Sequence, residues 1–173
     1  MAGTMRLYAV DLNSLYSEHN EALLRYLTRL TGDSDSAADA AQEAYTRMLA
    51  NPPARDDNLR AWLYTVATNV VRDGWKKQQT ALRLVQNQDR LPSASSPSDP
   101  HDQLEQNERR NVVRRALGRL SERDRTVLLM REEGFSHKEI AAAVDTTTKS
   151  VGTIIARALR KFAAEINTMG TQT

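Results

Sequence analysis

A stretch rich in serine, proline and aspartate, RLPSASSPSDPHD, divides the chain at residues 90–102. Its three prolines oppose a continuous helix, and its apolar side chains are too few to bury a core. We therefore expect residues 81–103 to form an extended, flexible linker. Because apolar residues recur at helical spacing on both sides of it, the chain is expected to fold as two small helical bundles joined by this linker.

The composition indicates an all-α protein. Only 5% of the 173 residues are aromatic and seven are glycine, whereas alanine, leucine, arginine and glutamine are common, which favours helices over sheet. The chain has no cysteine, so disulfides and thiolate metal sites are excluded. No apolar run approaches the ~18 residues of a membrane span, and the N-terminal residues lack the apolar segment of a signal peptide. We expect a cytoplasmic protein without membrane insertion.

Residues 1–80 are predicted to form a bundle of three helices with short connections. Apolar side chains recur at helical spacing, for example at Leu23, Leu27 and Leu30 in the first helix. Side-chain oxygens that cap a first turn, and glycine or proline after a last turn, favour particular helix ends. These signals are Asp11 or Asn13 and Gly32 for the first helix, Asp33 or Ser34 and the Pro52–Pro53 pair for the second, and Asn58 and the region of Lys77 for the third.

Residues 104–173 show the pattern of a helix-turn-helix domain, in which the last helix would enter the major groove of DNA. The helix signals are Ser121 and Gly134 for one helix, a capping box of Ser136 and Glu139 for the next, and Thr147 or Thr148 for the last. The inward side chains of the last helix are predicted to be Val151, Ile155, Ala158, Leu159 and Phe162. An ordinary helical hairpin has much the same pattern, so this segment favours DNA binding without excluding that alternative.

Catalytic and metal-binding constellations are not found in the sequence. His19, His101 and His137 lie in three different segments without partners at metal spacing. Asp35, Asp39 and Glu43 share one helical face, but a solvated acidic face explains them better than a metal site. There is no glycine-rich phosphate loop. We expect no enzymatic activity, no metal and no cofactor.

The predicted third helix carries a possible surface for single-stranded nucleic acid. Asn69 is followed by Arg72, Lys76 and Lys77 at spacings that keep most of them on one side, with Trp75 among them. Cations, aromatic rings and an amide suit a strand with unstacked bases. A solvated basic helix end, which the helix dipole favours anyway, is the alternative.

The predicted second helix carries a possible protein-binding face. Asp39, Gln42 and Glu43 lie three and four residues apart, so they share one face, and the surrounding alanines leave it shallow. Two carboxylates and an amide on a flat surface suit arginines of a partner helix. Plain solvent exposure is the alternative.

Taken in order, these segments resemble the extracytoplasmic-function (ECF) sigma factors of bacterial RNA polymerase. LLRYLTRLTGDSDSAADAAQEAYTRML resembles their first conserved region, and RAWLYTVATNVVRD resembles the next. LSERDRTVLLMREEGFSHKEIAAAV resembles the start of their C-terminal domain. The resemblance spans most of residues 12–162 apart from the linker, and the ordered set is more specific than any single motif.

The resemblance implies a role for each surface. The face of Asp39, Gln42 and Glu43 would dock on the β′ clamp helices of core RNA polymerase. The third helix and the loop before it, residues 52–58, would capture the non-template strand of the minus-ten promoter element. The residues implied in minus-ten binding are Asn58, Trp62, Asn69, Arg72, Lys76 and Lys77. The C-terminal domain would sit on the β flap and read minus-thirty-five DNA; the residues implied there are Thr148, Lys149, Thr153 and Arg157. The family also implies an anti-sigma factor or another regulator as a partner.

The net charge of +2 is small for a protein that holds DNA unaided. A sigma factor does not need a larger charge, because the polymerase core supplies much of the phosphate affinity. A free-standing helix-turn-helix regulator and a helical protein-binding adaptor are the two alternatives to a sigma factor.

Overall fold

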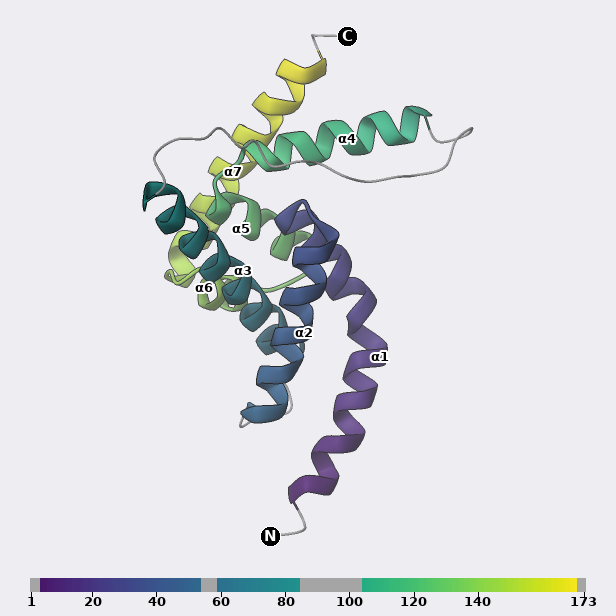
Figure 1. Ribbon diagram of the computed structural model, residues 1–173. Coiled ribbons are helices and arrows are strands. Elements are labelled where there is room, and N and C mark those ends of the chain that lie inside the picture. Colours follow the sequence, from purple (N-terminus) through teal and green to yellow (C-terminus); the bar gives the residue numbers. More distant parts are fainter. Residues whose placement is uncertain (1–3, 54–58, 85–103, 171–173) are drawn as a thin grey trace.

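The computed structural model describes residues 4–53, 59–84 and 104–170, and every regular element in these ranges is an α-helix (Figure 1). In chain order they are α1 (Thr4–Thr31), α2 (Ser34–Ala50), α3 (Leu59–Leu84), α4 (Leu104–Arg119), α5 (Glu122–Glu132), α6 (His137–Ala143) and α7 (Thr148–Gly170). The predicted all-α fold is confirmed.

Most of the predicted helix ends are confirmed by local geometry. Gly32, with φ +79°, ends α1 in the left-handed region that glycine adopts without strain. The Asp33 carboxylate accepts a hydrogen bond of 2.8 Å from the backbone N–H of Ser36, so Asp33, and not Ser34, caps α2. The hydrogen bonds to this carboxylate also lower the pKa of Asp33.

The helix ends of the C-terminal half depend on the same kind of contact. Ser121 caps α5, and Gly134, with φ +85°, follows its last turn. Ser136 and Glu139 form the full capping box of α6. The Thr147 hydroxyl accepts from the backbone N–H three residues on, so Thr147 caps α7.

Two predicted boundaries are wrong because the helices are longer than expected. α1 begins at Thr4, so neither Asp11 nor Asn13 is its cap. α3 continues to Leu84, which makes residues 81–84 helical rather than part of the linker. No glycine or proline stands between Lys77 and Leu84, and the residues there favour helix. Asn58, predicted to cap α3, and the remaining linker residues 85–103 lie outside the described residues.

The predicted inward face of α7 is partly wrong. Val151, Ile154 and Ala158 are buried, whereas Leu159 is 51% exposed and Ile155 is half-buried. The buried positions are three and four residues apart, so they form one stripe against α4, α5 and α6. Because apolar residues are adjacent in α7, two overlapping faces of the helix could be buried. In the folded protein, the face that includes Ile154 packs against the other helices.

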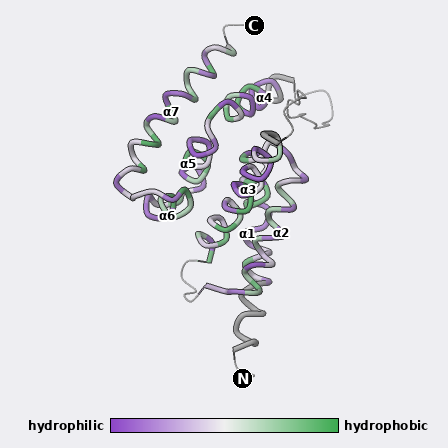
Figure 2. The backbone as a smooth tube through the Cα atoms, turned by 60° about the vertical axis from the view of Figure 1, so that its left-hand side comes forward, coloured by the Kyte–Doolittle hydropathy of each residue, from purple (hydrophilic) through white to green (hydrophobic). Residues whose placement is uncertain are grey.

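The two bundles pack against each other over one continuous core. Helices α1, α2 and α3 contact one another, as do α5, α6 and α7, and α3 also contacts α6 while α1 contacts α5 (Figure 2). The rings of Tyr26 and Tyr64 in the first bundle lie 5.0 Å apart, and Phe135 of the second bundle lies 4.8 Å from Tyr64. The sequence did not predict this contact between bundles.

Candidate nucleic-acid interface

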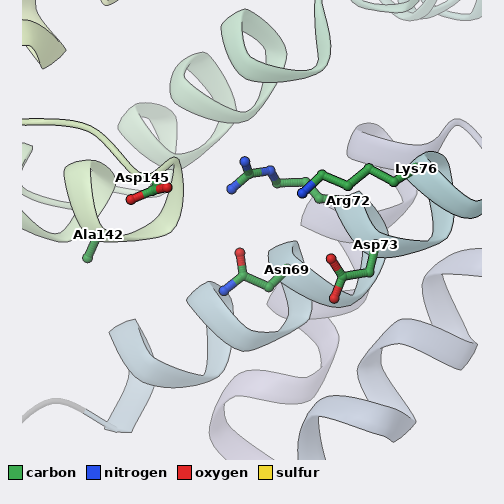
Figure 3. A pocket seen from close by; sticks show the side chains of 6 residues that line it. All are labelled: Asn69, Arg72, Asp73, Lys76, Ala142 and Asp145. Carbon is green, nitrogen blue, oxygen red and sulfur yellow. The ribbon is translucent and has the colours of Figure 1, made fainter.

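The polar face of α3 meets the helix-turn-helix at a shallow pocket of about 340 Å³ (Figure 3). Asn69, Arg72, Asp73 and Lys76 line it from α3, and Ala142 and Asp145 line it from the second bundle. The structure therefore brings together Asn69, Arg72 and Lys76, which the sequence predicted to act jointly. The lining also includes the carboxylates of Asp73 and Asp145, which balance the charge of the two cations. The amide and the cations are groups that can contact a base edge and a phosphate of a nucleic-acid strand.

Part of this face is occupied by the second bundle. Arg72 donates a hydrogen bond of 3.0 Å to the backbone oxygen of Ala143, the last residue of α6. A cation at the negative end of a helix is favourable, so this contact helps to hold α6 on α3. Trp62 is half-buried and Lys77 exposed, and neither lines the pocket.

The predicted reading residues of α7 lie on its exposed surface. Thr148, Lys149 and Thr153 are exposed. Arg157 is also exposed, but its guanidinium donates a 3.1 Å hydrogen bond to the carboxylate of Asp124 in α5. All four side chains can reach a molecule placed along α7.

The carboxylate of Asp124 is a functional candidate that sequence analysis missed. Its side chain is 1% exposed and accepts from both Arg157 and Lys161, the latter at 2.7 Å. Burial raises the pKa of Asp124, but hydrogen bonds from Lys161, then Arg157 and Ser121, outweigh it and leave the pKa below its usual value. In the sequence, Asp124 is the last residue of the capping motif LSERD, and this motif does not indicate that its side chain is buried.

The acidic face of α2 borders a broad groove of about 1180 Å³. Asp39 and Glu43 of α2 line it together with Val70, Val71 and Trp75 of α3. Glu43 pairs with Arg47 at 2.7 Å, whereas Asp39 is exposed. Gln42 is exposed next to them but does not line the groove, so two of the three predicted docking residues line it together with apolar residues.

Arginines that the sequence did not single out join the two bundles. Arg60 of α3 lies over the rings of Phe135 (4.3 Å) and Tyr64 (5.0 Å) and donates to the backbone oxygen of Glu133 at 2.9 Å. Burial, together with the Glu133 carboxylate, raises the pKa of Tyr64 to about 12. Arg125 of α5 donates at 2.8 Å to the backbone oxygen of Leu30, near the end of α1. Like Arg72, Arg60 and Arg125 each donate a hydrogen bond to a backbone carbonyl oxygen near the C-terminus of a helix in the opposite bundle. A cation is favourable there because it faces the negative end of the helix dipole.

Two further features, a metal site and a membrane span, are not found among the described residues. Within residues 4–53, 59–84 and 104–170, histidine, aspartate and glutamate do not gather in threes with the spacing of metal ligands. The helices in the same ranges are not long and apolar enough to cross a membrane.

Two family models match the chain: Sigma-70 region 2 over residues 15–81 and Sigma-70 region 4 over residues 110–162. The ECF RNA polymerase sigma factor SigL of Mycobacterium tuberculosis is 32% identical to it, with 96% of each chain covered. The RNA polymerase sigma factor YlaC of Bacillus subtilis is 24% identical, with 86% of this chain and 87% of YlaC covered.

Solved structures of sigma factors share the fold. RpoE of Bartonella quintana, in complex with the anti-sigma factor NepR, gives a TM-score of 0.74 at 21% identity over 91% of this chain and 97% of that one. CnrH, in complex with the cytosolic domain of CnrY, gives 0.64 at 21% identity over 96% and 92%. A region 2 bundle followed by a region 4 helix-turn-helix defines a sigma factor of the Sigma-70 type. Its full-length similarity to SigL shows that the chain belongs to the ECF RNA polymerase sigma factors.

Proposed function

We propose that the chain binds core RNA polymerase in the cytoplasm and directs it to specific promoters, without a catalytic step of its own. The N-terminal bundle captures the minus-ten strand, and the C-terminal helix-turn-helix reads the minus-thirty-five element. The observation that supports this proposal is the position of Asn69, Arg72 and Lys76 on one face of α3, within the region 2 match.

Docking on the polymerase is proposed for the acidic face of α2, with the C-terminal domain seated on the β flap. Asp39 and Glu43 offer carboxylates at the rim of a groove that a helix with arginines can enter. The β′ clamp helices are the proposed partner there. Charge-assisted contacts of this kind are stronger than neutral hydrogen bonds and favour arginine over lysine.

An anti-sigma factor is proposed as the regulator. Solved relatives of the same fold are complexes with NepR and with CnrY. In this chain the two bundles already contact each other, so a regulator that touches both would stabilise the packed arrangement by mass action.

The test is open-complex formation by reconstituted holoenzyme on a promoter that it recognises. We expect Asn69→Ala to lower the yield severely, because a lost polar base contact costs about 1–3 kcal/mol. Thr153→Ala removes one hydroxyl from α7 and should have a smaller effect. An unchanged open-complex yield in Asn69→Ala, combined with loss of initiation in Thr153→Ala, would refute this division of roles between the two bundles.

Gel shifts with and without core polymerase distinguish a sigma factor from a free-standing regulator. A free-standing regulator would bind promoter DNA equally well without core polymerase.

A further inference from the structure

A buried carboxylate lies directly behind the exposed basic surface of α7. Asp124 uses each of its two oxygens for a different cation: Oδ1 for the guanidinium of Arg157 and Oδ2 for the ammonium of Lys161. The carboxylate is 1% exposed, whereas the two cations are 51% and 50% exposed. The charged end of each cation is thus held by Asp124, although about half of each side chain is exposed.

The two cations continue a row of exposed polar residues along α7. Lys149, Thr153, Arg157 and Lys161 are four residues apart, so they form one ridge that turns slowly around the helix. The first three are among the four proposed minus-thirty-five contacts, and Lys161 extends the ridge by one turn. Arginine has five N–H donors and lysine has three, so both keep donors free after binding Asp124.

We propose that Asp124 is a positioning residue for minus-thirty-five recognition, which fixes Arg157 against base edges and Lys161 against the phosphate backbone. This inference rests on the proposed function of α7. A guanidinium held in one orientation discriminates between sequences, because less rotational freedom is lost when it binds. A freely moving cation attracts every phosphate alike and carries no sequence information.

The charge of this cluster distinguishes positioning from simple structural bridging. One carboxylate and two cations sum to one positive charge, and Asp124→Asn raises the sum to two without changing the shape of the side chain. General attraction to DNA should therefore increase while discrimination decreases. A residue that only ties α5 to α7 would instead weaken binding to all DNA as the domain loosens.

The experiment uses holoenzyme assembled from core polymerase and the full chain. Its affinity is measured for a recognised promoter and for the same promoter with a scrambled minus-thirty-five element. For Asp124→Asn we expect the preference for the intact element to fall about 5- to 100-fold, the range of a lost specific contact. Affinity for the promoter with the scrambled element should stay equal or rise. The slope of log affinity against log salt concentration should steepen by the amount expected for about one more phosphate contact. Arg160→Ala, which removes a cation of α7 that Asp124 does not hold, is the matched control and should leave the preference unchanged.

Two further variants keep the test decisive. Asp124→Glu retains the charge but moves the carboxylate, so the preference should fall while the salt dependence stays as in the wild type. In an Arg157→Ala background, Asp124→Asn should change the preference little, because the positioned group is gone. An unchanged preference in Asp124→Asn, or a parallel loss for both promoters with a lower melting temperature, would overturn the inference. Absence of any promoter preference in the wild-type holoenzyme would instead refute the proposed function.

Discussion

Two carboxylates one turn apart on α2 are used differently in the free protein. Glu43 is paired with Arg47, whereas Asp39 is exposed and makes no ion pair with the described residues. Asp39 can therefore accept a cation from a partner without giving up an existing contact. We expect Asp39→Ala to weaken binding to core polymerase by about 1.5–3 kcal/mol, the range for hydrogen bonds to charged groups.

The measurement is a titration of labelled chain with core polymerase. Glu21→Ala removes an exposed carboxylate of α1 and serves as the control, with core affinity expected to stay as in the wild type. Equal affinities of the wild type and Asp39→Ala, with unchanged helix content, would show that α2 docks elsewhere or by other residues.

At the scale of the element, α6 depends strongly on its capping box. The helix has only seven residues, and Ser136 accepts from the backbone N–H of Glu139 while the Glu139 carboxylate accepts from Ser136. Since so short a helix has few internal hydrogen bonds, loss of a cap affects most of it. We expect Ser136→Ala to lower the free energy of unfolding by about 0.5–2 kcal/mol in urea titrations.

Ser34→Ala is the matched control, because Ser34 begins α2 but Asp33 provides the cap. Its free energy of unfolding should stay close to that of the wild type. If Ser136→Ala and Ser34→Ala lowered the free energy of unfolding by the same amount, the hydroxyl of Ser136 would not stabilise α6 as a cap.

Elements also show what the sequence can and cannot specify. Helix ends such as Gly32 and Ser136 were predictable, because caps act within a few residues of the chain. The buried side of α7 was not, since Ile154, Ile155 and Leu159 offer two overlapping apolar faces and only packing chooses between them. The α3 residues of the candidate site share one helical face and could be grouped in advance, whereas Asp124 needed the fold to reveal its inward position.

On the scale of the whole molecule, the bundles are joined by arginines that act across a long separation in sequence. Arg60 reaches Glu133 and Phe135, and Arg72 reaches Ala143, contacts that no local pattern can predict. Arg72 is also a proposed minus-ten contact, and it is half-buried where it donates to α6, so the second bundle occupies part of the surface that a DNA strand would need. Separation of the bundles should therefore accompany promoter binding.

We expect Arg60→Ala to shift the free chain toward separated bundles, since it removes two ring contacts and a hydrogen bond to a helix end. A loss of about 1–2 kcal/mol would raise the ratio of open to closed molecules roughly 5- to 30-fold. The chain has no cysteine, so dyes can be attached to Leu49→Cys of α2 and Leu159→Cys of α7, both exposed positions. Energy transfer between single pairs of dyes reports the two populations.

Arg25→Ala, which breaks an exposed pair within α1, is the control for this experiment and should leave energy transfer unchanged. Higher salt should act in the same direction as Arg60→Ala, because it screens the exposed Arg29–Glu132 pair between the bundles. A distribution that neither Arg60→Ala nor salt alters would mean that these contacts do not hold the bundles together.

Promoter-directed initiation by the whole molecule is the claim on which the other proposals depend. Its most direct test is transcription of a pool of genomic DNA fragments by core polymerase with and without the purified chain, followed by sequencing of the transcript 5′ ends. We predict that the chain creates discrete start sites preceded by a shared two-part motif at the minus-ten and minus-thirty-five positions. Start sites that are the same with and without the chain would contradict its assignment as the factor that selects promoters.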